Sequence, residues 1–194
     1  MQPDWTIFWR HRQMAWSSKV TRRDDVAKLM ASLTDELHLT YRVLIDQPKS
    51  YITWSHRRFT LRQMVEVDGE QGATFIDKDI KLTEQMLTAQ TEKQVEDQGR
   101  NFHCWDHRRL LLQMQQTNID NDGELALTTR LIKSSMSNFS AWHYRSQLLK
   151  ERITDKTVQM ELDLIINAVC VDPTDQSIWL YYKWIVSHAT KGNL

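Results

Sequence analysis

The residues of this chain that most resemble metal ligands are two histidines and a cysteine. His103 and His107 stand four residues apart with Cys104 between them, which places both imidazoles on one helix face, as in zinc sites. No second ligand pair at a suitable spacing accompanies them, so we predict no metal and no cofactor in this chain. No Ser-His-Asp or Cys-His order and no phosphate-binding glycine-rich loop stands out, and we expect no self-contained active site.

Two cations stand where helices are expected to begin. Lys49 precedes Ser50 and Arg100 precedes Asn101, and both Ser and Asn are common helix N-caps. The positive end of a helix disfavours a neighbouring cation by roughly 0.3–1 kcal/mol, unless an anion binds there. Lys49 and Arg100 are therefore candidate contacts to an anionic group. The alternative is that both are exposed, solvated cations.

Most of these residues lie in or beside a pattern that occurs five times. Each copy has a tryptophan, then His or Tyr two residues later and, in four of the five copies, Arg three residues later. The copies begin at Trp9, Trp54, Trp105, Trp142 and Trp179. Four residues before the last four tryptophans stand the N-cap types Ser50, Asn101, Asn138 and Asp175.

A feature that recurs in every copy is more simply architectural than catalytic. We predict that the tryptophans are buried between stacked helices and that the arginines hydrogen-bond carboxylates or helix-end carbonyls. The predicted structural residues are Trp9, Arg12, Trp54, Arg57, Asn101, Trp105, Arg108, Asn138, Trp142, Arg145 and Trp179. The middle slot holds His11, His56 and His107 but also Tyr144 and Tyr181, so it is not expected to bind a metal.

The elements that position these residues are predicted to be paired helices. The steps between the tryptophans are 45, 51, 37 and 37 residues, periods typical of stacked helical pairs. Between the Trp-bearing helices, amphipathic helices are predicted at 77–98, 124–133 and 157–171, the last with the strongest apolar stripe. Residues 67–72 are predicted to form an inserted loop that explains the longest step, and 120–123 a turn. The sequence predicts an all-α fold with one helical-repeat domain over residues 1–194.

Composition narrows the class of protein further. The 194 residues include 25 basic and 25 acidic side chains, so no net charge attracts nucleic acid or an anionic membrane. No run approaches the roughly 20 apolar residues of a membrane span, and two cysteines do not form a secreted disulfide framework. We expect a cytoplasmic protein. The helix that should stack before the Trp9 helix is missing, so we expect a shortened repeat protein or a start assigned too late.

The unit Asn-x-x-x-Trp-x-x-Arg resembles the repeat of the protein prenyltransferase α-subunit family. Segments 101–109 and 138–146 closely resemble α subunits of the type II enzymes, the Rab geranylgeranyltransferases, as do segments 48–51 and 172–179. The resemblance covers roughly residues 3–188, and five copies in order make it specific.

The resemblance implies an α–α superhelix, a right-handed solenoid of antiparallel helix pairs, wrapped around a β subunit. That β subunit would supply a zinc ion, the lipid pocket and most contacts to geranylgeranyl diphosphate. The zinc-bound thiolate of a C-terminal cysteine of a Rab GTPase, presented by a Rab escort protein, would attack C1 of the lipid as diphosphate leaves. This chain alone would be inactive.

The resemblance also assigns candidate site residues. Lys49 matches a diphosphate contact of the type II pattern, and Arg100 matches the position of a diphosphate-binding lysine in farnesyltransferase-type α subunits. Phe102 and His103 would border that site, and Tyr51 is a further candidate at the diphosphate site or the β-subunit interface. Tyr182 departs from the family, because Arg is usual there.

Two other functions stay open at this stage. The first is the shared α subunit of farnesyltransferase and geranylgeranyltransferase I. The amino-acid sequences of segments 102–106 and 175–179 argue against it. The second is a non-catalytic helical-repeat scaffold, such as a degenerate paralogue or a tetratricopeptide-like adaptor. The tetratricopeptide period of 34 residues does not match these steps.

Overall fold

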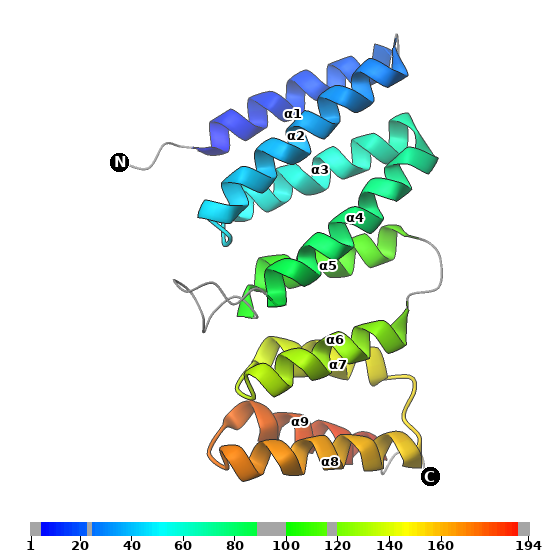
Figure 1. Cartoon of the computed structure of the whole chain (residues 1–194). Helices are drawn as coiled ribbons and strands as arrows, with labels where there is room; N and C mark the ends of the chain where they lie inside the picture. The colour runs from blue at the N-terminus through cyan, green and yellow to red at the C-terminus, as the bar shows by residue number, and fades with distance from the viewer. Residues whose placement is uncertain (1–4, 23–24, 89–99, 116–119, 190–194) are drawn as a thin grey trace. The chain divides into compact units, whose positions relative to one another are not determined.

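Every regular element in the described part of the chain is an α-helix (Figure 1). The computed structural model describes residues 5–22, 25–88, 100–115 and 120–189. Its helices are α1 (Trp5–Arg22), α2 (Val26–Asp46), α3 (Tyr51–Val67), α4 (Gly69–Thr88), α5 (Phe102–Met114), α6 (Asn121–Ser134), α7 (Phe139–Leu149), α8 (Asp155–Val171) and α9 (Gln176–Ala189). The all-α prediction is confirmed for these residues, and none of their helices is long and apolar enough to cross a membrane.

We call the helices that carry the Trp pattern (α1, α3, α5, α7 and α9) the Trp helices, and the last four of them begin directly after the predicted caps. Side-chain oxygens accept a hydrogen bond from a backbone N–H of the first turn at Ser50 (3.4 Å), Asn101 (3.2 Å), Asn138 (3.1 Å) and Asp175 (2.7 Å). Each bond satisfies a donor that the helix itself leaves free. The four predicted N-caps are confirmed.

The predicted loop at residues 67–72 is wrong. Helix α3 ends at Val67 and α4 begins at Gly69, so Asp68 alone joins them. The Asp68 N–H donates to the Met64 carbonyl (2.9 Å), while its carboxylate accepts from the Gln71 N–H (2.9 Å) and caps α4. A Cβ on Gly72 would lie 2.6 Å from Val65 Cα, so this glycine lets two helices approach closely rather than forming a loop.

The predicted turn at residues 120–123 is also wrong beyond its first residue. Asp120 is an N-cap whose side chain accepts from the Gly123 N–H (3.0 Å), and α6 already begins at Asn121. The predicted helices at 124–133 and 157–171 are confirmed as parts of α6 and α8. Of the helix predicted at 77–98, residues 77–88 belong to α4, and the remainder lies outside the described residues.

Helix contacts divide the chain into two compact units, which are described separately. The first unit holds residues 1–85 and 101–117, and the second holds 86–100 and 118–194. In the first unit α3 packs against α1, α2 and α5. The core of this unit, to which α4 contributes Ile76, also contains Trp16, Leu33, Leu61, Met64 and Leu111. The single domain over residues 1–194 stays a prediction.

In the second unit α7 packs against α6 and α9, and α9 also packs against α8. The strong apolar stripe predicted for α8 is buried only in part. Ile165 and Ala168 are buried, whereas Ile166 is 58% exposed and Cys170 is exposed. The described contacts cover one face of α8, and Ile166 and Cys170 lie off that face.

Candidate functional site

The arginine of each central Trp helix reaches back to the helix that precedes it. Arg57 is buried, and its Nη1 donates to the Leu37 carbonyl and to the Thr40 hydroxyl, both at 2.8 Å. The same two kinds of acceptor recur as Ile80 and Thr83 for Arg108 and as Leu125 and Thr128 for Arg145. Each of these arginines therefore joins two helices. The carbonyls that they reach lie within α2, α4 and α6 rather than at the predicted helix ends, and the threonine three residues after each carbonyl adds a second acceptor.

A carboxylate stands one residue before each of these carbonyls, a signal that the sequence analysis missed. The helices that precede α3, α5 and α7 carry the motif acid-Leu/Ile-x-Leu-Thr at 36–40, 79–83 and 124–128. The acids Glu36, Asp79 and Glu124 are buried, as is Glu161, the corresponding acid in α8. We call these residues and their hydrogen-bond donors the carboxylate clusters.

Each carboxylate accepts a hydrogen bond from the His-or-Tyr slot of the Trp helix that follows. His56 Nε2 donates to Glu36 (2.9 Å) and His107 Nε2 to Asp79 (2.7 Å). In the same way Tyr144 Oη donates to Glu124 (2.9 Å) and Tyr181 Oη to Glu161 (2.8 Å). Imidazole and phenol occupy the same slot because each presents one hydrogen-bond donor to the carboxylate. This donor role explains the His-or-Tyr slot without a metal.

Three of the carboxylates also bind the arginine of the preceding copy. Arg12 Nε donates to Glu36 (3.0 Å), Arg57 Nε to Asp79 (3.0 Å) and Arg145 to Glu161 through both Nε and Nη2 (2.7 Å each). Each of these clusters therefore joins two consecutive copies of the pattern. A buried carboxylate is costly unless it is paired and hydrogen-bonded, and these are.

The pKa values of the carboxylates reflect this pairing. Burial alone would raise the pKa of Asp79, but the charge of Arg57 and hydrogen bonds from His107 and Arg57 lower it to about 2. Burial likewise opposes ionisation of Glu36, yet the donors His56, Arg12 and Trp16 lower its pKa to about 2. Burial lowers the pKa of His107, which favours the neutral imidazole.

The fifth copy departs from the pattern at two matched positions. Tyr182 replaces the arginine, and Ile165 replaces the threonine that would receive it. Trp179, predicted to be buried, is 41% exposed, although its Nε1 donates to the Pro173 carbonyl (2.7 Å). Trp142 is covered by the ring of Tyr181 (centroids 4.7 Å apart), whereas no following Trp helix among the described residues covers Trp179.

In the first unit, Tyr51, Phe102 and His103 lie together at the start of α3 and α5. The ring centroids of Tyr51 and His103 are 5.8 Å apart, and those of Phe102 and His103 are 4.2 Å apart. Tyr51 and Phe102 are 60% and 61% exposed, and Lys49 is exposed two residues before Tyr51. The structure therefore gathers four of the five candidate site residues at the N-terminal ends of two Trp helices in this unit.

The charge environment of His103 is positive on balance. Partial burial and the nearby Arg58 lower its pKa, and the carboxylate of Asp106 only partly opposes this. Arg58 Nη1 donates to Asp106 (2.8 Å), and Arg109 Nη2 donates to the same carboxylate (3.3 Å). His103 is thus a neutral, half-buried imidazole beside cations.

Arg100, the fifth candidate, belongs to the second unit. It is exposed, and its Nη2 donates to the Ser137 hydroxyl just before the cap of α7. A hydroxyl satisfies a donor but leaves the positive charge of the guanidinium in place. Arg100 therefore keeps a positive charge that could bind an anion. It belongs to the second unit, whereas Lys49 belongs to the first.

The His103, Cys104 and His107 spacing does not assemble a metal centre. His107 Nε2 is engaged by Asp79, and the Cys104 thiol donates to the Thr83 carbonyl (3.7 Å). Burial raises the pKa of Cys104 to about 12, so the thiol stays protonated. Within the described ranges no group of three or more His, Cys, Asp or Glu side chains could hold a metal ion.

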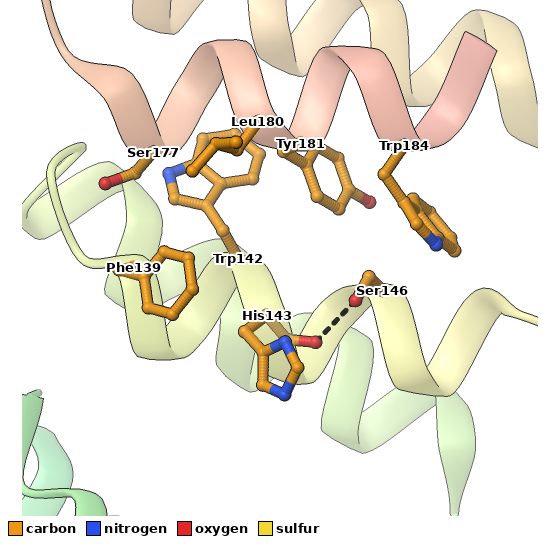
Figure 2. Close-up of a pocket in the computed structure, with 8 residues that line it drawn as sticks. All are labelled: Phe139, Trp142, His143, Ser146, Ser177, Leu180, Tyr181 and Trp184. Atoms are coloured by element: carbon orange, nitrogen blue, oxygen red, sulfur yellow. Dashed lines mark hydrogen bonds between the residues drawn. The ribbon is translucent and has the colours of Figure 1, made fainter. Parts of the chain in front are cut away.

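The second unit carries an aromatic groove between α7 and α9 (Figure 2). Its volume is about 130 Å³. Phe139, Trp142 and His143 line it from α7, and Leu180, Tyr181 and Trp184 line it from α9, with Ser146 and Ser177 at its edges. The phenyl ring of Phe139 and the imidazole of His143 are nearly parallel, with centroids 5.9 Å apart. The groove offers an apolar side chain a shallow seat beside two hydroxyls.

The comparison with protein families decides the identity of the repeat. Three segments, 33–64, 121–152 and 158–189, match the model of the protein prenyltransferase alpha subunit repeat. The chain belongs to this family. Each matched segment covers the acid-bearing part of one helix and most of the Trp helix that follows, so it contains one buried carboxylate and its His-or-Tyr donor. These prenyltransferase repeats fit the predicted α–α superhelical fold.

Named relatives cover nearly the whole chain. The mouse protein named geranylgeranyl transferase type-2 subunit alpha is 32% identical over 198 residues, covering 96% of this chain and 32% of the relative. Proteins with the same name from Dictyostelium discoideum (31% identical) and Saccharomyces cerevisiae (28%) match 95% and 96% of this chain. In both, the match covers 55% of the relative. The chain thus spans about a third to a half of the length of these relatives.

Proposed function

We propose that this chain acts as the α subunit of a heterodimeric Rab geranylgeranyltransferase. The enzyme transfers a geranylgeranyl group from geranylgeranyl diphosphate to C-terminal cysteines of Rab GTPases. One observation carries the proposal. Proteins named geranylgeranyl transferase type-2 subunit alpha from mouse, an amoeba and a yeast match 95–96% of the length of this chain, at 28–32% identity. The amino-acid sequences of the repeats favour a type II α subunit over the shared α subunit of farnesyltransferase and geranylgeranyltransferase I.

In this proposal the chain does not carry out the chemistry alone. A β subunit supplies zinc, which activates the cysteine thiolate of the substrate, and most of the lipid pocket. The buried histidines and carboxylates of this chain are used in the carboxylate clusters, which supports a scaffolding role for them. The Rab protein arrives with its escort protein, and we place the complex in the cytoplasm.

The role we propose for Lys49 is to hold the diphosphate. Negative charge builds on the diphosphate as its bond to C1 of the lipid breaks, so a fixed cation lowers the barrier. Lys49 is exposed beside the N-terminus of α3, where the helix dipole also favours an anion. Neutral His103 and the Tyr51 hydroxyl, which lie nearby on α5 and α3, would add hydrogen bonds without adding charge.

Arg100 is a second proposed cation for the anionic group. Its guanidinium bonds to the Ser137 hydroxyl, a contact that orients the side chain without neutralising its charge. The exposed rings of Phe102 and Phe139, one in each unit, are proposed contacts to the β subunit, as is the groove between α7 and α9. Phe102 lies against His103, which in turn lies beside the exposed ring of Tyr51, and such a group of exposed rings is typical of an interaction surface.

The function is tested by reconstituting the chain with a prenyltransferase β subunit. We expect transfer of labelled geranylgeranyl to a Rab protein with its escort, little transfer to a C-a-a-X peptide, and none without the β subunit. A preference for the C-a-a-X peptide would instead favour the shared farnesyltransferase-type α subunit. A stable complex that modifies neither substrate would favour a non-catalytic scaffold.

The role of Lys49 is tested in the same assay with Lys49→Ala. Loss of a charge-assisted contact is worth about 1–3 kcal/mol, so we expect kcat/KM to fall by roughly 5- to 150-fold with β-subunit binding unchanged. The matched control is Lys28→Ala, an exposed lysine in the first turn of α2. Equal activity of both variants would remove Lys49 from the site.

A further inference from the structure

The side chain of Asn101 is buried and hydrogen-bonded at both ends of its amide. Its Oδ1 accepts from the Cys104 N–H (3.2 Å) and caps α5, while its Nδ2 donates to the Pro48 carbonyl (2.7 Å). Only 3% of the residue is exposed. The first bond is an ordinary helix cap, but the second reaches back 53 residues to the turn before α3.

The Pro48 carbonyl belongs to the peptide unit that leads into Lys49. It accepts two hydrogen bonds, from Asn101 Nδ2 and from Trp54 Nε1 (2.8 Å). The peptide unit is planar and proline fixes its own φ, so holding this carbonyl fixes the orientation of the chain as it enters Lys49. The Ser50 N–H donates to the Gln47 carbonyl (3.1 Å) and closes the turn on the other side.

The second unit shows that the fold does not require the donor from Asn101. There the Met136 carbonyl takes the place of Pro48 and accepts from Trp142 Nε1 (2.7 Å). The residue in the slot of Asn101 is then Asp175, whose carboxylate caps α9 by accepting from the Ser177 N–H but has no N–H to give. Capping and tryptophan packing therefore persist in a copy that lacks this donor.

We infer that Asn101 is a positioning residue for Lys49: its amide fixes the Pro48–Lys49 peptide so that the ammonium group meets the diphosphate at a set place. The inference rests on the proposed function, in which Lys49 contacts the leaving group. A cation held on a turn stabilises a transition state only if it is correctly placed, and displacement by about 1 Å lowers rates strongly. The bond from Asn101 to Pro48 supplies this placement from the next repeat.

The test is a double-mutant cycle in the complex with the β subunit, using Asn101→Ser, Lys49→Ala and both together. Serine keeps a cap like that of Ser50 on α3 but has no donor that spans the distance to Pro48. Transfer to a Rab protein with its escort is measured as kcat/KM. Hydrogen exchange at the Ser50 amide is measured on each complex as a direct report on the turn.

We expect Asn101→Ser to lower kcat/KM by about 10-fold in the wild-type background and by less than about 2-fold in the Lys49→Ala background. Exchange at Ser50 should be faster in both backgrounds. Equal losses in the two backgrounds would show that Asn101 acts through the fold and would overturn the inference, as would unchanged activity of Asn101→Ser. If Lys49→Ala alone changes nothing, the proposed site falls and the inference with it. If no complex transfers lipid, the proposed function fails, and exchange at Ser50 still decides whether Asn101 holds the turn.

Discussion

At the residue scale, the chain buries one carboxylate in each full copy of its pattern and surrounds it with donors. Asp79 illustrates the balance, because desolvation opposes its charge while Arg57 and His107 restore it. Removing one partner from such a group leaves a buried charge with neither its partner nor water, which lowers the free energy of unfolding by roughly 3–5 kcal/mol. The clusters therefore stabilise the packing of consecutive helices against each other.

Two tryptophans in the same slot should differ sharply in their contribution to stability. Trp105 is 3% exposed, and Trp105→Ala should lower the free energy of unfolding by about 3–5 kcal/mol through a core cavity. Trp179 is 41% exposed, so Trp179→Ala is the matched control and should cost about 1 kcal/mol. Denaturant unfolding measures both, and equal costs would contradict the burial described for Trp105.

The stability of the protein should fall in two separate ranges of pH. The pKa of His107 is lowered from 6.5 by burial, so below pH 6.5 the unfolded chain binds a proton that the folded chain resists, and stability falls. The pKa of Asp79 is about 2 in the folded chain against 3.8, so its contribution is present above 3.8 and is lost toward pH 2. This second loss is roughly 2 kcal/mol.

His107→Tyr separates the titration of His107 from that of Asp79. Tyrosine already occupies this slot in two other copies, as Tyr144 and Tyr181, and it stays neutral near pH 6. The variant should keep the contact to Asp79, and its loss of stability between pH 7.5 and 5.5 should be smaller than that of the wild type. Urea unfolding at the two pH values measures the difference. An unchanged pH dependence would mean that another group titrates in this range.

At the element scale, the three central repeats pair a helix that carries acid-Leu/Ile-x-Leu-Thr with a helix that carries Trp-x-His/Tyr-Arg. The arginine of the second helix satisfies a carbonyl and a threonine hydroxyl on the first, as Arg145 does with Leu125 and Thr128. The fifth copy lacks both Thr and Arg, at Ile165 and Tyr182. The two losses are matched, because an arginine without its hydroxyl would lose an acceptor and a buried hydroxyl without its arginine would lose a donor.

Restoring both residues should reveal their coupling. Ile165→Thr alone should cost about 1–2 kcal/mol, because it buries a hydroxyl without the arginine and removes apolar volume. Tyr182→Arg alone should change stability little, since Tyr182 is 37% exposed. In the double variant the cost should be about 1 kcal/mol smaller than the sum of the single effects. Additive costs in thermal or denaturant unfolding would contradict the pairing.

The sequence predicts those elements whose causes are local. The caps at Ser50, Asn101 and Asn138 are correct because an N-cap is decided within three residues. Gly72 was misread as a loop residue because its role, close approach to Val65 in another helix, is tertiary. The carboxylate clusters were missed for the same reason, although their motif recurs visibly at 36–40, 79–83 and 124–128. Four candidate site residues lie together in the first unit, and their role toward the diphosphate stays a prediction.

At the scale of the whole molecule, we propose that the repeat scaffold works together with a second subunit. The repeat matches show the family. The type II enzyme is proposed from named relatives, of whose length this chain covers about a third to a half. The exposed rings of Tyr51 and Phe102, which cluster with His103, favour a partner that covers them. The chain is therefore expected to work as part of a complex.

The most direct test is isolation of this chain from extracts of its own cells, followed by mass spectrometry of the proteins that remain bound. We expect a prenyltransferase β subunit in a one-to-one ratio with the chain, and transfer of geranylgeranyl to a Rab protein by the isolated complex. A folded chain that carries no β subunit, and that binds none when one is added, would rule out its role as a prenyltransferase α subunit.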